Sequence, residues 1–143
     1  MATSGVINGT KFAVYAAGVK IAYATSASIS MNHNLRDTST KDSGGWKDQL
    51  EGQRDWEVSV EGMLIFTDAA GAISGLTMDE LYSTYIANRD VFTLTFNTAV
   101  TGDLGWSGQA FMTSLSADTP NEDSSTWSGT FSGTGALTQA AVV

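Results

Sequence analysis

Alternation of apolar and polar residues predicts much of the secondary structure of this chain. Between Val19 and Met31 the apolar residues share one parity and the serines share the other, with one break expected near Ala24. Residues at every second position lie on the same face of a β-strand, so this segment is expected to be half buried. Its apolar members are Val19, Ile21, Tyr23, Ala27, Ile29 and Met31.

A second strand pattern runs from residue 54 to Phe66. Trp56 belongs to a row of apolar residues, whereas Glu57 and Glu61 belong to the intervening polar row. This spacing is typical of a strand with one buried face and one acidic face.

A third strand pattern lies near the C-terminus. Hydroxyl residues occupy the even positions of 126–134, and Trp127 and Phe131 alternate with glycines at the odd positions. A face made of hydroxyl groups suits contact with water or with another sheet. Shorter strands are predicted at 12–15, 91–96 and 106–115.

One helix interrupts the strands. Thr77 followed by Glu80 has the spacing of a capping box, in which each side chain bonds the other residue's backbone amide. The helix is expected to end at Asn88–Arg89 and to cover an open face of the sheet. Its apolar residues, at helical spacing, are Met78, Leu81, Tyr82 and Tyr85.

Residues 32–53 lack a clear hydrophobic period. This polar segment exceeds the ~12–15 residues beyond which loops without their own structure are usually functional or disordered. Mixed charges around Trp46 favour a long loop that becomes ordered against a partner. The charged residues proposed for that contact are Arg36, Asp37, Lys41, Asp42 and Lys47.

Composition limits the classes of function. The 143 residues predict a single domain over 1–143, and the lack of cysteine removes disulfides and thiolate metal sites. A net charge of −8, with no Lys or Arg after Arg89, disfavours stable binding to nucleic acid. We also expect neither a signal peptide nor a membrane-spanning segment.

The residues offer little for catalysis, so the chain is predicted not to be an enzyme and to need no cofactor or metal. His33 is the only histidine. Glu57 and Glu61 are four strand positions apart, about 13 Å at ~3.3 Å per residue, which exceeds the spacing of a glycosidase carboxylate pair. The acidic run at 118–123 does not match a calcium loop.

The tryptophans leave one alternative function open. Trp56 and Trp127 share parity with core residues and are expected to be buried. Trp46 and Trp106 are candidates for exposure, as in a monomeric β-sandwich that binds carbohydrate through exposed indoles.

Several segments resemble the major tail tube proteins of long-tailed bacteriophages. They are 38–47, which reads TSTKDSGGWK, 56–62, which reads WEVSVEG, and the closing GTGALT of 133–138. The resemblance covers nearly the whole chain. It implies a mainly β fold, an antiparallel sandwich flanked by one helix, whose copies close into hexameric rings that stack into a tube.

The resemblance also implies partners and a location. In that family the long loop, here about 32–53, reaches the neighbouring ring. Expected partners are further copies of the chain, the tape measure protein, and tail terminator or distal tail proteins. DNA passes through without stable binding, there is no membrane partner, and the virion tail is assembled in the host cytoplasm.

Two sets of residues follow as candidates for assembly and transport. Ring stacking is predicted to use the loop residues, and Glu57 and Glu61 are the candidates for the wall of the bore. An acidic wall repels a passing polyanion, which then does not adhere. The loop residues are Arg36, Asp37, Lys41, Asp42, Trp46 and Lys47.

Overall fold

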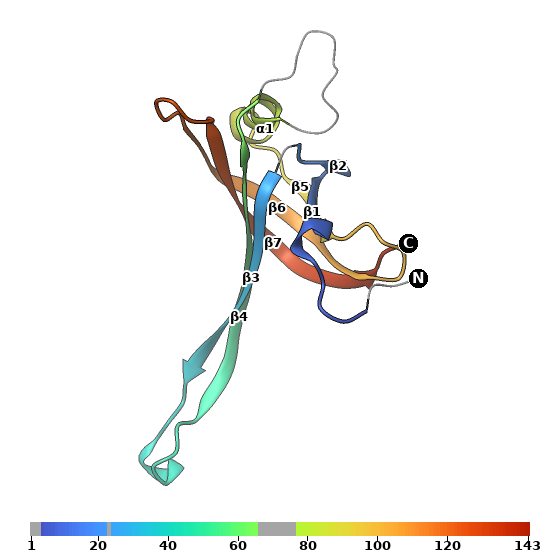
Figure 1. Ribbon diagram of the computed structural model, residues 1–143. Coiled ribbons are helices and arrows are strands. Elements are labelled where there is room, and N and C mark those ends of the chain that lie inside the picture. The colour runs from blue at the N-terminus through green and yellow to red at the C-terminus, as the bar shows by residue number, and fades with distance from the viewer. Residues whose placement is uncertain (1–3, 23, 66–76) are drawn as a thin grey trace.

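The computed structural model describes residues 4–22, 24–65 and 77–143. Within these residues seven strands form one antiparallel sheet in the order β2-β1-β5-β6-β7-β4-β3 (Figure 1). The predicted mainly β, antiparallel fold with a flanking helix is confirmed. The strands are β1 (Ala13–Ala16), β2 (Val19–Lys20), β3 (Ala24–Asp37), β4 (Gln49–Met63), β5 (Phe92–Asn97), β6 (Leu104–Asp118) and β7 (Thr126–Ala141).

The parity patterns correspond to observed strands. In β4, Trp56, Val58 and Val60 are buried, whereas Glu57 and Glu61 are exposed. The break expected near Ala24 separates β2 from β3, and these strands lie at opposite edges of the sheet. Two residues of the predicted patterns, Tyr23 and Phe66, lie outside the described residues.

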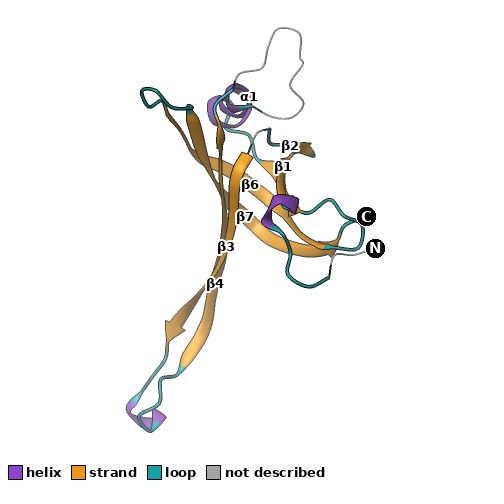
Figure 2. Cartoon of the chain, viewed as in Figure 1, coloured by secondary structure: helices purple, strands orange, loops and turns teal. Residues whose placement is uncertain are grey.

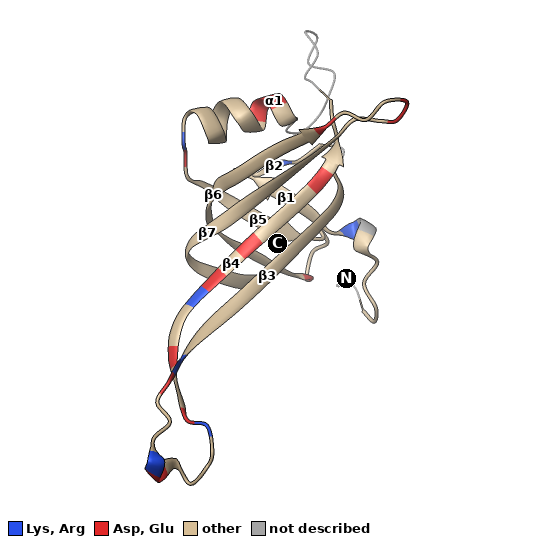
Figure 3. Ribbon diagram, turned by 90° about the vertical axis from the view of Figure 1, so that its left-hand side faces the viewer, with Lys and Arg blue, Asp and Glu red and all other residues tan. Residues whose placement is uncertain are grey.

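The sheet curls so that its two halves enclose one core. Strands β4 and β7 lie in front of β1 and β5 in the view of Figure 3, and Figure 2 shows the same two layers from the side. Buried residues of both halves belong to a single cluster, including Val14 of β1 and Val58 of β4. Phe92 of β5 meets Phe131 of β7 edge to face, with ring centroids 5.5 Å apart. One curled sheet thus provides both layers of the expected sandwich.

Glycines on β6 and β7 make room for the Trp56 indole. A methyl group at Gly133 would overlap the indole ring, and one at Gly108 would lie 2.7 Å from Trp56 Cζ2. The indole Nε1–H donates to the Gly135 carbonyl at 3.3 Å. Gly133, one of the glycines that alternate with apolar residues near the C-terminus, therefore admits a large side chain from β4.

Replacing Gly133 with alanine is expected to destabilise the fold by about 1–3 kcal/mol, because the core must shift to accept the methyl group. Gly9→Ala is the matched control, since no atom lies within 4 Å of the added methyl group there. Urea unfolding measured by tryptophan fluorescence gives both free energies. Equal stability of the two variants contradicts the close packing at Trp56.

The predicted helix is present, and its N-terminal cap is as expected. An α-helix, α1 (Met78–Leu81), continues with π-type winding through Ala87. The Thr77 amide donates to a Glu80 carboxylate oxygen at 3.1 Å, within a reciprocal capping box. Leu81 and Tyr85 are buried, but Tyr82 is exposed and does not belong to the buried face.

The helix packs onto the sheet through Tyr85. Its ring lies 4.1 Å from that of Phe92 on β5, measured between centroids. Burial, followed by the nearby Asp90 carboxylate, raises the pKa of the Tyr85 phenol. The helix ends at Asn88, and Arg89 adopts a φ of 59°, so the predicted helix end is confirmed.

The segment 32–53 differs from the expected aperiodic loop. β3 and β4 continue as a paired hairpin to Asp37 opposite Gln49, so only residues 38–48 form the connection. The strands carry polar residues on both faces here because the hairpin projects beyond the body and has no core to cover (Figure 1). We call residues 32–53 the arm.

Candidate assembly surfaces

The tip of the arm is held by hydrogen bonds within the chain. The Thr38 amide donates to the Asp48 carbonyl at 2.9 Å, and the Asp48 amide donates to the Ser39 hydroxyl at 2.7 Å. A helical turn, Lys41–Ser43, is closed by a capping box between Thr40 and Ser43. The tip therefore has hydrogen-bonding partners within its own chain, and its ordering against a neighbouring copy stays a prediction.

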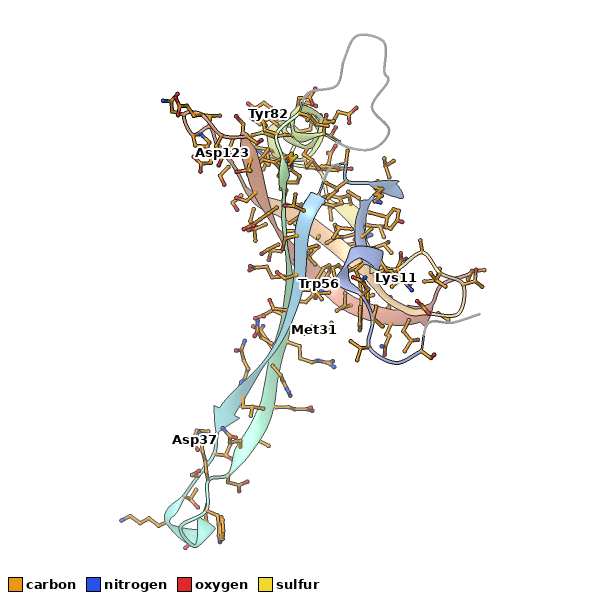
Figure 4. The ribbon with its side chains drawn as sticks, viewed as in Figure 1. Lys11, Met31, Asp37, Trp56, Tyr82 and Asp123 are labelled. Atoms are coloured by element: carbon orange, nitrogen blue, oxygen red, sulfur yellow. The ribbon has the colours of Figure 1, made fainter. Side chains whose placement is uncertain are left out.

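The structure brings the six predicted stacking residues together on this arm. Arg36 and Asp37 end β3, Lys41 and Asp42 lie in the helical turn, and Trp46 and Lys47 precede β4. All six are exposed, and Trp46 retains 83% of its accessible surface. Asp37 lies on the arm (Figure 4), and the Ser39 amide donates to Asp37 Oδ1 at 2.9 Å. This bond, followed by the bond from the Ser39 hydroxyl, lowers the pKa of Asp37.

Glu57 and Glu61 are exposed on the face of β4 opposite the buried Trp56, Val58 and Val60. The acidic positions of β4 are red in Figure 3. Glu57 stands opposite Ser30 of β3 and Ser132 of β7. Glu61 stands between Ser26 and Ser128 in the same way. An acidic column on β4 is thus flanked by small polar residues, so this face is hydrophilic.

Several strand edges of the described sheet have no partner strand, including the outer edge of β2 and, over residues 49–56, the β7 side of β4. Two others border the four strands β3, β4, β7 and β6. β3 pairs only with β4, so its other edge is open over residues 24–37. β6 pairs with β5 only at residues 106–110. The edge of β6 that faces β5 is therefore open over residues 111–118. The open edge of β6 could not be predicted from the sequence. The spacing of hydrophobic residues indicates which face of a strand is buried, but it does not indicate where the neighbouring strand ends.

The tryptophans do not form a shared platform. Trp56 and Trp127 are buried, as predicted. Trp106 is half buried, with its ring 6.3 Å from that of Phe96, whereas Trp46 lies at the arm tip. The carbohydrate-binding alternative is left with one fully exposed indole among the described residues.

In the described part of the chain, no three His, Asp or Glu side chains gather as metal ligands. No helix in the same residues has the length and apolar character needed to cross a bilayer.

The sequence and the fold were compared with known proteins. The family model described as phage tail tube protein matches residues 13–139. No curated protein matches the sequence significantly. The comparison of folds gives matches to several assembled tails.

Three solved structures share this fold at low sequence identity. A chain of the virion of a native gene transfer agent particle aligns with a TM-score of 0.74 at 22% identity, covering 95% of this chain and 100% of that one. The SPP1 tail tube gives 0.72 at 11% identity, covering 95% and 80%. A chain of the sheath/tube terminator of the extracellular contractile injection system PVC gives 0.70 at 18%, covering 96% and 99%.

Proposed function

This chain belongs to the phage tail tube protein family, and from that premise we propose that six copies close into a ring and that rings stack into a tube. The coarser role, a structural subunit of the tail tube of a phage or phage-like particle, follows from the family and the shared fold. The finer proposal is supported most directly by the two open strand edges.

Ring closure requires one surface of a subunit to meet a different surface of the next. The open edge of β3 and the open edge of β6 are two such surfaces, at opposite sides of the four strands β3, β4, β7 and β6. Pairing them between copies satisfies the free backbone amides and carbonyls and leaves a barrel without edges. The outer face of these strands then becomes the wall of the barrel.

The bore is proposed to be lined by the face that carries Glu57 and Glu61. The opposite face of the same strands is covered by the subunit's own core, so the hydroxyl-rich acidic face is the one available to the bore. Repeated carboxylates repel the phosphates of DNA, and the genome passes during ejection without stable binding.

Reversing the charge of the proposed bore tests this assignment. Tubes of a Glu57→Lys/Glu61→Lys variant are expected to retain short duplex DNA that wild-type tubes release, with retention that falls as salt is raised. Asp90→Lys is a control at an exposed residue near the helix. Retention by the control at the level of the double variant, measured by cosedimentation, contradicts the placement in the bore.

Other tail components complete the proposal. We propose the tape measure protein and the tail terminator or distal tail proteins as further partners, with assembly in the host cytoplasm. These partners rest on the family alone.

Electron microscopy of the purified chain at increasing concentration tests the proposed assembly. Rings and then tubes are expected, accompanied by a rise in sedimentation coefficient. A monomer that persists at every concentration, with or without added oligosaccharide, contradicts ring closure. A monomer that shifts its fluorescence on binding sugar instead supports the carbohydrate-binding alternative, through Trp46.

A further inference from the structure

One asparagine of the chain is followed directly by glycine. The asparagines are Asn8, Asn32, Asn34, Asn88, Asn97 and Asn121, and only Asn8 precedes a glycine, Gly9. The side-chain amide of an asparagine can be attacked by the backbone nitrogen of the next residue. A Cβ atom on that next residue hinders the approach, and glycine has none. The sequence therefore makes Asn8 the asparagine most open to this attack.

The fold does not require a glycine at position 9. Every other glycine whose surroundings the structure describes either is crowded, as at Gly133, or has a positive φ, as at Gly18. At Gly9 no atom lies within 4 Å of an added methyl group, and φ is outside the left-handed region. Packing and backbone conformation would both accept alanine there. What the missing Cβ changes at this position is access to the backbone nitrogen.

Both residues of the pair are open to water. Asn8 and Gly9 are exposed, and residues 4–7 before them are exposed as well and belong to no helix or strand. Val6 is fully exposed and Ile7 is 41% exposed, so little of this segment packs on the body. Water and hydroxide therefore reach the pair in the folded subunit.

A single turn restrains the pair on its C-terminal side. The Lys11 amide donates to the Asn8 carbonyl at 3.0 Å, and the Phe12 amide donates to the Gly9 carbonyl at 3.2 Å, around the helical turn Gly9–Lys11. Ring closure between the two residues reorients the peptide that joins them, so these bonds are expected to open first. One exposed turn opens locally at a small cost in free energy. The reaction is therefore expected without global unfolding.

We infer that Asn8–Gly9 is a site of spontaneous deamidation. The Gly9 nitrogen loses its proton to hydroxide and bonds to Asn8 Cγ; the Cγ–Nδ2 bond breaks, and Nδ2 takes a proton from water and leaves as ammonia. Water then opens the succinimide ring. Cleavage between the Gly9 nitrogen and Cγ gives aspartate, whereas cleavage between that nitrogen and the main-chain carbonyl carbon gives isoaspartate. Either product adds one negative charge to a subunit whose net charge is −8.

The isoaspartate product is expected to disturb the fold locally. It routes the main chain through the former side chain and so adds one carbon atom to the backbone, which spoils the spacing of the turn that Lys11 closes. Phe12, the next residue, stacks on Phe96 of β5 with ring centroids 5.0 Å apart. Isoaspartate at position 8 should weaken this contact, whereas aspartate keeps the ordinary backbone and should leave it intact.

Peptide mapping by mass spectrometry tests the inference on the purified full chain during incubation at mildly alkaline pH. The peptide that contains Asn8 is expected to gain the mass difference between an amide and an acid. Gly9→Ala keeps Asn8 and is expected to slow the reaction by about tenfold or more, because its Cβ raises the barrier to attack. Asn121, which is exposed and precedes Glu122, is the internal reference and should stay intact.

Three results would overturn the inference. One is an equal rate in the wild type and in Gly9→Ala, and another is earlier modification of a different asparagine. The third is modification of Asn8 only when the chain is unfolded in urea, because the turn then protects the pair in the folded subunit. None of these measurements requires ring formation, so they leave the proposed function untouched.

The two products can be compared through a substitution. Asn8→Asp supplies the pure aspartate product and should unfold in urea like the wild type. Incubated chains that carry isoaspartate, separated by chromatography, are expected to unfold at lower urea concentration. Equal midpoints for the isoaspartate chains and for Asn8→Asp contradict the predicted effect on the Phe12 contact.

Discussion

Deletion of Asp37–Lys47 is expected to leave folded subunits that form rings but do not elongate into tubes. The deletion removes the arm tip and five of the six predicted stacking residues, whereas Arg36 is retained. The core is untouched, because the deleted residues are exposed or half buried beyond the body. We expect no tubes longer than a few rings at concentrations where the wild type elongates fully.

The hairpin register makes this deletion conservative. Arg36 stands opposite Leu50, so joining Arg36 to Asp48 leaves a two-residue turn, Asp48–Gln49, between paired positions. Two-residue hairpin turns favour Asn-Gly, and a second version with Asp48→Asn and Gln49→Gly provides that turn. Thermal unfolding of both versions should match the wild type within a few degrees.

Substitution of single residues at the tip shows what the deletion removes. Trp46→Ala is expected to shorten tubes and Asp42→Ala to change them little, because the exposed indole has the larger apolar surface to cover. Tube lengths measured by negative-stain microscopy give the comparison. Wild-type lengths from the deletion variant refute a stacking role for the tip.

The sequence predicted those parts of the fold in which burial imposes a period. Trp56, Val58 and Val60 point into the core, so their parity revealed β4, and the Thr77–Glu80 pair revealed the helix start. The arm was missed as a hairpin because neither of its faces is buried in one subunit. A hydrophobic pattern carries no information about a strand that has no core to cover.

A β-bulge adds a second reason why the arm is hard to predict from the sequence. Between the pair His33–Arg54 and the pair Leu35–Glu51, β4 advances by three residues where β3 advances by two. The extra residue therefore lies on β4, where Gly52 and Gln53 stand opposite Asn34. Alternation along β4 is interrupted at this point, so parity alone does not give the face on which a residue of the arm lies.

A proline substitution on the open edge of β3 is expected to abolish ring formation while preserving the fold of the subunit. Successive backbone amides along a strand point to opposite edges of that strand. Only one of the two variants Ala27→Pro and Ser28→Pro therefore removes a hydrogen bond to β4. That variant should lose about 1–3 kcal/mol of stability, because the β4 carbonyl is left without its donor. The other should unfold like the wild type yet sediment as a monomer.

The same substitution on β6 completes the argument, because a heterologous contact uses two different edges. Of Ser116→Pro and Ala117→Pro, the variant that keeps its bond to β7 should also be a monomer. In a mixture with the β3 variant, the β6 variant supplies an intact β3 edge and the β3 variant supplies an intact β6 edge. Each pair of subunits can then form one contact and no more. The mixture should therefore give dimers by sedimentation equilibrium, and a mixture that remains monomeric shows that the two edges are not partners.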